Sequence, residues 1–432
     1  IGIQANASNG LAWGCAGGFS SGSTAVFSNA AAKRDVSSRE ISGIPTVYTG
    51  NQAYDNIGNA LGSDDFNQDG YSDLIIGASV LDKAYLIYGG SKVSTGVAST
   101  LAHTIQGYTN TEVGSAIATG DLNGDGIPEL VLGSPKSNTS ATDAGMVFVF
   151  DSDGLEFTSI DPAVDAITSL DGPSTSTKAR AGSTVHIPGD INGDGYGDLL
   201  VGAPYHDGAA TNAGAVYLFY GQTSLPSSED LEGGDRFEGT DVNDRIGQAL
   251  GGGDADGDGY SEILIGAPKV DSTDIDAGAV YYIANGSWTG NNSAATEATA
   301  TFQGTTALDV FGTSLGMGDI DADGLLDFVF GAPKNSLNGS KSGATYLFLD
   351  AASWSGTFTG SSADHVLTGS ATDQQVGTAI AMGDFNADGN GDFAVSAPNA
   401  GVTTPSGGAV FVYTDMPPST SSTVTDADQV IG

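Results

Sequence analysis

The sequence has few basic residues and a single cysteine. Its 432 residues contain 13 Lys and Arg against 52 Asp and Glu, a formal net charge of −39 at pH 7. A surface this acidic repels phosphate backbones and anionic membranes, which argues against nucleic-acid binding. The lone Cys15 excludes an intrachain disulfide. We expect it to be a small buried residue, with an intermolecular bridge as the alternative.

Long apolar runs are also absent. No stretch of about 18 apolar residues occurs, so we expect no membrane span. The chain begins at Ile1 rather than Met, which fits a processed secreted protein or a piece of a longer one. Sites of the form Asn-x-Ser/Thr give weak further support to an extracellular or cell-surface location. They are Asn6, Asn138, Asn285, Asn291 and Asn338.

Glycine, by contrast, is abundant, and much of it belongs to a repeat that occurs six times. Each copy opens with an apolar or small residue followed by Gly, as in Ile246-Gly247. An acidic loop follows, and twelve residues after its first Asp comes a turn such as Gly266-Ala-Pro268. Successive loops start 56 to 69 residues apart. Apolar runs bounded by turn residues, such as Ile263-Leu-Ile265, indicate about four short strands in each unit.

Four-stranded units repeated in this way predict an all-β fold, a seven-bladed β-propeller of antiparallel blades. The six repeats supply six blades, and residues 1–50 resemble a degenerate blade without an acidic loop. The expected blades with loops are 51–107, 108–172, 173–239, 240–304, 305–369 and 370–418. The tail 419–432 ends at Ile431-Gly432, and the chain starts at Ile1-Gly2, the same kind of pair. We therefore expect the N- and C-terminal segments to pair and close the ring, within one chain or between neighbours.

The acidic loops predict cation sites. Loop positions 1, 3, 5 and 9 carry oxygen-bearing side chains, position 6 is Gly in every copy, and position 7 would offer its main-chain carbonyl. Oxygen ligands in this number favour Ca²⁺ over Mg²⁺, and the lack of nearby Cys or His argues against zinc. We expect about six structural Ca²⁺ ions. The predicted side-chain ligands are Asp65, Asn67, Asp69 and Asp73; Asp121, Asn123, Asp125 and Glu129; Asp190, Asn192, Asp194 and Asp198; Asp254, Asp256, Asp258 and Glu262; Asp319, Asp321, Asp323 and Asp327; and Asp384, Asn386, Asp388 and Asp392. The predicted carbonyl ligands are Tyr71, Ile127, Tyr196, Tyr260, Leu325 and Asn390.

A known family shows the same three elements. The succession Phe311-Gly312, Asp319–Asp327 and Gly331-Ala-Pro333 resembles the FG-GAP repeat of the integrin α-subunit head and its bacterial and archaeal relatives. The resemblance is strong over about residues 50–415. It implies a seven-bladed propeller that holds Ca²⁺ in a loop between two strands of a blade. The family serves adhesion, carbohydrate binding and, joined to other domains, hydrolysis, so the fold alone leaves function open.

No catalytic constellation stands out. Of the four histidines, His103, His186, His206 and His365, either His186 or His206 could belong to a site, but lone histidines on loops are expected to be solvated. Lys33, Arg34 and Arg39 form a small basic cluster, expected to be a solvated loop or short helix. Trp288 and Trp354 occupy similar places in neighbouring repeats, where outer-strand packing is the expectation and stacking on sugars the alternative.

The sequence thus predicts an extracellular, calcium-stabilised and non-enzymatic scaffold for adhesion or assembly. The expected partner is another protein or a second copy, in the latter case as a filament built through the chain ends. The alternatives are a lectin-type propeller that binds glycans and a secreted hydrolase.

Overall fold

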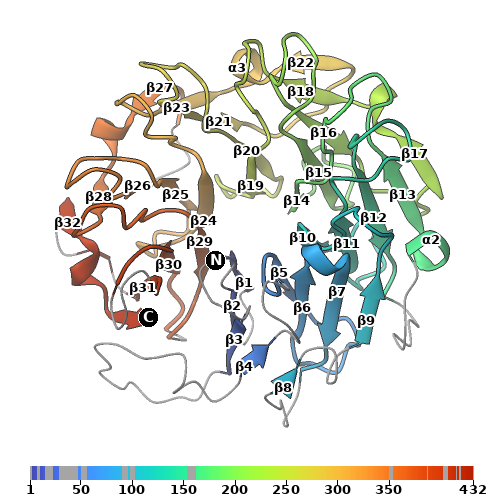
Figure 1. The fold of residues 1–432 in the computed structure, drawn as a ribbon, viewed down its shortest axis with the longest axis horizontal. Coiled ribbons are helices and arrows are strands. Elements are labelled where there is room, and N and C mark those ends of the chain that lie inside the picture. The colour runs from blue at the N-terminus through green and yellow to red at the C-terminus, as the bar shows by residue number, and fades with distance from the viewer. Residues whose placement is uncertain are drawn as a thin grey trace.

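The sheets form a ring around a central axis (Figure 1). The computed structural model describes residues 56–89, 103–152, 162–349, 354–386, 388–401, 407–414, 416–417 and 420–431, and the strand backbones at 2–6, 10–14, 23–28, 47–49 and 96–97. Cys15 and the basic cluster Lys33–Arg39 lie outside the described residues. The prediction of an all-β propeller is confirmed, with mostly antiparallel blades.

Each of the six repeats builds one blade. A repeat supplies the inner, second and third strands, and the segment before the next repeat supplies the outer strand. In chain order the blades are β5 (Leu61–Asp64), β6 (Asp73–Ala78), β7 (Lys83–Ile87) and β9 (His103–Gln106); β10 (Ile117–Gly120), β11 (Glu129–Gly133), β12 (Met146–Phe150) and β13 (Thr168–Asp171); β14 (Thr184–Gly189), β15 (Asp198–Ala203), β16 (Ala215–Phe219) and β18 (Arg236–Glu238); β19 (Ala249–Gly253), β20 (Glu262–Ala267), β21 (Ala279–Ile283) and β23 (Ala300–Gln303); β24 (Ser314–Gly318), β25 (Asp327–Ala332), β26 (Ala344–Phe348) and β28 (His365–Thr368); and β29 (Ile380–Gly383), β30 (Asp392–Ala397), β31 (Ala409–Tyr413) and β33 (Gln429–Ile431).

A further sheet is formed by strands near the N-terminus, of which only the backbone is described. It comprises β1 (Gly2–Asn6), β2 (Gly10–Gly14), β3 (Ser23–Ser28) and β4 (Val47–Thr49). Its first strand, β1, contacts β29 on one side and β5 on the other. Figure 1 shows the N-terminus near the centre of the ring, beside these two strands.

Five sheets carry a fifth strand that the prediction of four-stranded blades did not include. The added strand belongs to the chain segment of the next blade and pairs in parallel with the outer strand of the preceding one. The added strands are β8 (Gly96–Val97), β17 (Ser228–Asp230), β22 (Asn291–Ser293), β27 (Gly356–Thr359) and β32 (Ser421–Thr423). Adjacent blades are therefore joined at their outer edges as well as by packing.

The helices in the described residues are short and lie in the connections between strands. They are η2 (Ser79–Leu81), α2 (Pro162–Asp165), η3 (Leu231–Gly233), α3 (Ala294–Glu297), η5 (Gly360–Ser362) and η6 (Val424–Asp426). Across the described part of the chain, no helix has the length and hydrophobicity needed to span a membrane.

The predicted pairing of the two chain ends is wrong for the strands that the structure describes. β33 pairs with β31 of its own blade, whereas β1 pairs with β2. The tail is an outer strand like those that end the other blades, and this explains why its sequence resembles the lead-in to a repeat. It is thus already paired within its own sheet.

The two glycine motifs of a repeat contact each other directly. In all six repeats the N–H of the opening Gly donates to the carbonyl of the first residue of the Gly-Ala-Pro-like turn, for example Gly182 to Gly202 at 3.0 Å. Gly202 also packs against the next blade, where an added Cβ would overlap the carbonyl oxygen of Gly247. The fixed spacing of the motifs therefore reflects a hydrogen bond within a blade and close backbone packing between blades.

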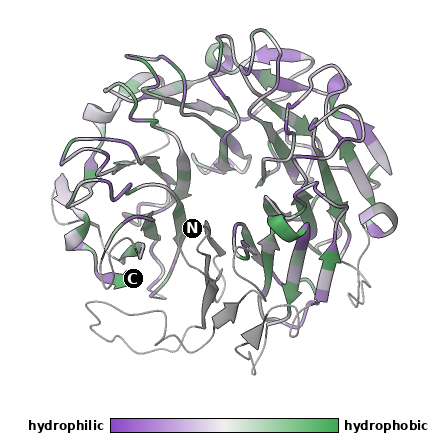
Figure 2. Cartoon of the chain, in the orientation of Figure 1, coloured by the Kyte–Doolittle hydropathy of each residue, from purple (hydrophilic) through white to green (hydrophobic). Residues whose placement is uncertain are grey.

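The core consists of layers between adjacent blades. Every residue of β15 and β16 is buried, and one apolar cluster joins Val131 and Val147 of one blade to Val201 and Tyr217 of the next. Figure 2 shows hydrophobic colouring along these strands and hydrophilic colouring toward the rim of the ring. Because each blade buries both faces, its second and third strands are mainly apolar and do not alternate, although the second strand of every repeat begins with an acidic residue such as Asp198.

Candidate cation loops

Each acidic loop joins the inner strand of a blade to its second strand. Loop 3, for example, runs from Asp190, after β14, to Asp198, the first residue of β15. The glycine at position 6 has a positive φ in all six loops. The values range from 84° at Gly126 to 94° at Gly389. An added Cβ would meet no atom within 4 Å at these glycines. Glycine is thus favoured here by the left-handed backbone conformation and not by a lack of room for a side chain.

The loops are curled by hydrogen bonds from their own main chain. In each loop the position 1 carboxylate accepts the N–H of the position 6 glycine, as from Gly195 to Asp190 at 2.7 Å. The side chain at position 5 accepts the N–H of position 7, as from Tyr196 to Asp194 at 3.1 Å. These bonds curl the main chain of each loop around its acidic side chains, as a cation site requires.

The carboxylate at position 9 is the buried member of the set. In all six loops it accepts the N–H of position 2, at 2.5 to 3.0 Å. Burial, with the nearby loop carboxylates, raises the pKa of Asp73, Glu129, Glu262 and Asp392 to about 7 and that of Asp198 to about 6. The loop therefore holds an ionised position 9 carboxylate poorly by itself.

The donor set fits a hard cation. Carboxylate oxygens of Asp254, Asp256 and Glu262 lie within 4.8 Å of one another, and the same holds for Asp319, Asp321 and Asp327. Oε1 of Glu262 and Oδ1 of Asp392 are both buried, and neither has a hydrogen-bond partner. A bound cation would satisfy such an oxygen and neutralise the crowded carboxylates. Four loops have Asn at position 3, which contributes a neutral oxygen.

One candidate ligand, Asp151, was not predicted from the sequence. Asp151 follows β12 and lies outside loop 2, but one of its oxygens lies within 4.8 Å of oxygens of Asp125 and Glu129. It also contributes to raising the pKa of Glu129. The sequence did offer a signal: Asp151 is a carboxylate directly after the third strand, where the other five repeat-built blades have Tyr, Ala, Leu or Thr.

Neighbouring loops contact each other through position 7. The ring of Tyr196 lies against Gly124 of the preceding loop, where an added Cβ would be 2.7 Å from Cε1. Tyr260 lies against Gly193 in the same way, with a corresponding distance of 3.0 Å. The side chains of Tyr196 and Tyr260 thus have a packing role that is separate from the carbonyl ligation predicted for these residues.

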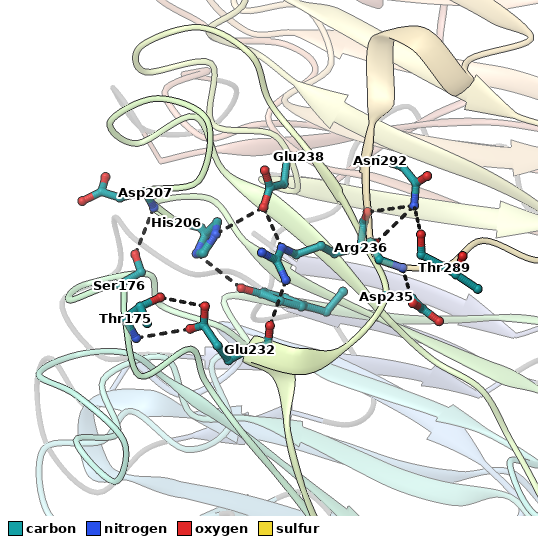
Figure 3. Close-up of polar contacts among 12 residues, drawn as sticks. Thr175, Ser176, His206, Asp207, Glu232, Asp235, Arg236, Glu238, Thr289 and Asn292 are labelled. Atoms are coloured by element: carbon teal, nitrogen blue, oxygen red, sulfur yellow. Dashed lines mark hydrogen bonds and ion pairs between the residues drawn. The ribbon is translucent and has the colours of Figure 1, made fainter.

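His206 belongs to a buried polar network and not to a solvated loop, so that expectation is wrong for this residue. Its Nδ1 lies 3.3 Å from the hydroxyl of Tyr217, and its Nε2 lies 3.6 Å from Oε1 of Glu238 (Figure 3). Arg236 donates to the same oxygen at 2.6 Å. Burial, with Arg236 nearby, lowers the pKa of His206. The contacts join the turn after β15 to β16 and β18, so we interpret the network as a clasp within one blade.

The remaining residues singled out from the sequence have structural surroundings. His186, on β14, lies 3.3 Å from the carbonyl oxygen of Gly252 in the next blade, and burial lowers its pKa. His103 packs edge-on against Tyr88, and His365 lies on β28. The expected packing of the tryptophans is confirmed: Trp288 contacts Phe237, and Trp354 contacts Phe302, Phe348 and Phe358.

Comparison with known proteins agrees with this geometry. The FG-GAP repeat family matches residues 57–95, 113–150, 181–219, 246–283, 311–348 and 376–413. Phosphatidylinositol-glycan-specific phospholipase D from Bos taurus is 32% identical over 192 residues, which cover 41% of this chain and 22% of that protein. Integrin alpha-PS5 from Drosophila melanogaster is 33% identical over 164 residues, 37% of this chain and 15% of that protein. Integrin alpha-5 from Xenopus laevis is 27% identical over 220 residues, 48% and 19% of the two chains.

Three features recur in six blades of this propeller: an apolar or small residue followed by Gly, an acidic loop, and a Gly-Ala-Pro-like turn. Together they define a class of repeat proteins. The chain belongs to the FG-GAP repeat family and resembles the propellers of integrin alpha subunits. It spans less than a quarter of the length of each relative named above.

Proposed function

We propose that this protein is a calcium-stabilised, extracellular propeller that serves as a non-enzymatic scaffold for binding another protein. The observation that carries the calcium assignment is the buried position 9 carboxylate, which is crowded by like charges and, in Glu262, keeps an oxygen without a partner. The loops would hold the ions through the side chains predicted above, and the ions would supply the positive charge that these carboxylates lack.

The scaffold assignment is supported by the integrin alpha relatives and by the nature of the polar clusters. The loop carboxylates occupy turns that connect strands, and the His206 network joins elements of a single blade. The packed tryptophans give no support to the lectin alternative. The relationship to a phospholipase D covers only 22% of that protein, so a hydrolase would depend on what its remaining parts contribute.

The extracellular location is supported by the cation sites. Extracellular calcium modules function with dissociation constants of about 10⁻⁴–10⁻³ M, concentrations of calcium that are not sustained in the cytosol. The Asn-x-Ser/Thr sites are consistent with this location.

We further propose that the ring has seven blades, with the sheet β1–β4 completing the six built by repeats. In support, β1 contacts both β29 and β5, and the inner strands from β5 to β29 contact one another in chain order. The parallel pairing of β8 with β4 resembles the junctions between the other blades.

Differential scanning calorimetry tests the calcium proposal. We expect a chelator to lower the melting temperature and added Ca²⁺ to restore it, because ions bound only to the folded state stabilise it. One ion at a free concentration about a hundred times its dissociation constant adds about 2.7 kcal/mol. An unchanged melting temperature after complete chelation, checked by atomic emission, contradicts the proposal.

A further inference from the structure

Two arginines from adjacent blades stack on one tyrosine. The guanidinium carbons of Arg180 and Arg245 each lie 4.9 Å from the ring centroid of Tyr205. Arg180 is in the loop that enters β14, Arg245 is in the corresponding loop before β19, and Tyr205 is in the turn after β15. Because strands alternate in direction, these loops lie at the end of the blades opposite the cation loops.

The backbone holds both arginines at equivalent positions. Arg180 has φ 56° and Arg245 has φ 55°, a left-handed conformation that is uncommon for residues other than glycine. The N–H of Arg180 donates to the carbonyl of Asp143, and that of Arg245 donates to the carbonyl of Asn212. Tyr205 is bound to the first of these loops through its N–H, which donates to the carbonyl of Ala179. The three side chains are therefore placed by fixed main-chain contacts.

Among the described residues, neither guanidinium has an anionic partner. In the described part of the chain, Arg180 and Arg245 form no ion pair, and their side chains donate no hydrogen bond. Both are half-buried, and Nε of Arg245 is buried without a partner. Two positive charges thus contact one aromatic ring and no carboxylate within the described ranges, although the chain contains 52 carboxylates. Their mutual repulsion would be relieved by an anion bound to both.

The residues at the same turn position in the flanking blades behave differently. Lys136 corresponds to Tyr205 in the preceding blade and pairs with Glu112 at 2.6 Å. Lys269 corresponds to it in the following blade and pairs with Asp276 at 2.6 Å. The chain thus neutralises the cations on either side and leaves the arginine pair between them available.

We propose that Arg180, Tyr205 and Arg245 form a binding site for a carboxylate side chain of an acidic segment in a partner protein. The planar guanidinium matches a carboxylate with two parallel hydrogen bonds, and the tyrosine hydroxyl offers a further donor. Two observations favour a peptide over an acidic polysaccharide. The lysines at the same turn position in the flanking blades are already paired, and the exposed Lys178 near Arg180 adds one cation and not a row, which suits a short peptide better than a polymer of regular charge. Val242, three residues before Arg245, is 63% exposed and offers an apolar contact.

This inference deepens the proposed function, because it names the chemistry by which a protein-binding scaffold would hold its partner. The test uses the whole chain with saturating Ca²⁺ and a fluorescein-labelled hexaglutamate peptide as the probe. Fluorescence anisotropy should show binding that weakens as salt is raised. Arg180→Gln and Arg245→Gln should each weaken it about tenfold, since a charge-assisted hydrogen bond contributes roughly 1.5–3 kcal/mol.

Lys269→Gln is the matched control, because it also removes one positive charge from the same ring of turns. It should change the affinity less than about threefold, since this lysine already pairs within the chain. No binding by the wild type, or equal weakening by all three substitutions, overturns the site. Tighter binding of an oligogalacturonate than of hexaglutamate overturns the peptide assignment. The calorimetric response to Ca²⁺, measured on the same samples, tests the proposed function separately from the site.

Discussion

The main-chain carbonyl of Asp121 accepts a hydrogen bond from the N–H of Gly197 at 3.0 Å, although the two residues lie in acidic loops of different blades. The same bond joins Asp190 to Ser261 at 2.7 Å and Asp319 to Gly391 at 2.6 Å. Loops 4 and 5 are joined through Ala255 and Leu326, at 3.2 Å. Loops 2 to 6 thus form a continuous series.

Loop 1 lies outside this series, because the residue of loop 2 that would donate to it is Pro128, which has no N–H. We expect disruption of loop 3 by Asp190→Asn with Asp194→Asn to remove one ion and to weaken binding in the neighbouring loops by severalfold. The matched change in loop 1, Asp65→Asn with Asp69→Asn, should remove one ion and leave the others unaffected. Isothermal titration with Ca²⁺ measures both. Equal effects of the two double substitutions on the remaining ions would show that the loops are not coupled through these bonds.

Asp151 should be a ligand of the ion in loop 2. Asp151→Asn removes a charge within 4.8 Å of the oxygens of Asp125 and Glu129. We expect the affinity of one ion to fall about tenfold, with the others unchanged. Asp143→Asn is the control, because it makes the same charge change in the same blade at the other end of its strands. If both variants titrate like the wild type, Asp151 is not a ligand.

Gly202 should tolerate no side chain. An added Cβ would overlap the carbonyl oxygen of Gly247 and the hydroxyl oxygen of Thr184. We expect Gly202→Ala to lower the free energy of unfolding by about 1–3 kcal/mol, the usual cost of overpacking. Gly233→Ala is the control, because no atom lies within 4 Å of an added Cβ there. Urea unfolding of both variants with saturating Ca²⁺ makes the comparison, and equal midpoints would refute the role of close packing between blades.

Asp309 should make stability depend on pH. Its carboxylate is buried, accepts a hydrogen bond from Asn335 at 2.8 Å, and has a pKa raised by burial from 3.8 to about 6. A raised carboxyl pKa means that the folded state prefers the protonated form. The stabilisation is therefore complete below about pH 4 and is lost as the pH rises through about 6.

Asp309→Asn removes this ionisation and can still accept from Asn335. The variant should match the wild type near pH 4 and be more stable at pH 8, by no more than about 3 kcal/mol. Melting curves with saturating Ca²⁺ across this range provide the measurement. Asp373→Asn, at an exposed position in a corresponding loop, should show no such difference. A constant difference between Asp309→Asn and the wild type at every pH would assign the effect to packing instead.

The repeat made much of the fold predictable. The opening apolar-Gly pair, the acidic loop and the turn are each recognisable from a few neighbouring residues. Their regular spacing over six repeats indicates the order of the strands, which a single repeat could not indicate. The candidate loop ligands were predicted from residue type and position, and in loops 4 and 5 the structure brings carboxylate oxygens of three of them within 4.8 Å of one another. The apolar runs within the second and third strands, such as Leu199-Leu-Val201 in β15, also followed from the sequence.

Contacts made by the main chain were not predictable. The bond from Gly197 to Asp121 depends on no side chain, and the parallel pairing of β17 with β13 joins residues 228–230 to 169–171 through backbone groups. Polar strands such as Ser228–Asp230 carry no apolar pattern that would mark them. The tail was misplaced for a related reason: its resemblance to a lead-in segment was recognised, but such segments are the outer strands of the preceding blade.

The parallel strands at the rim have a mechanical consequence. Adjacent blades are held at the inner side by close glycine packing and at the outer edge by a strand that crosses from one blade to the next. Pulling two such blades apart must break both attachments together. A tensile force carried through a binding partner would therefore be spread over neighbouring blades and would not peel one of them away.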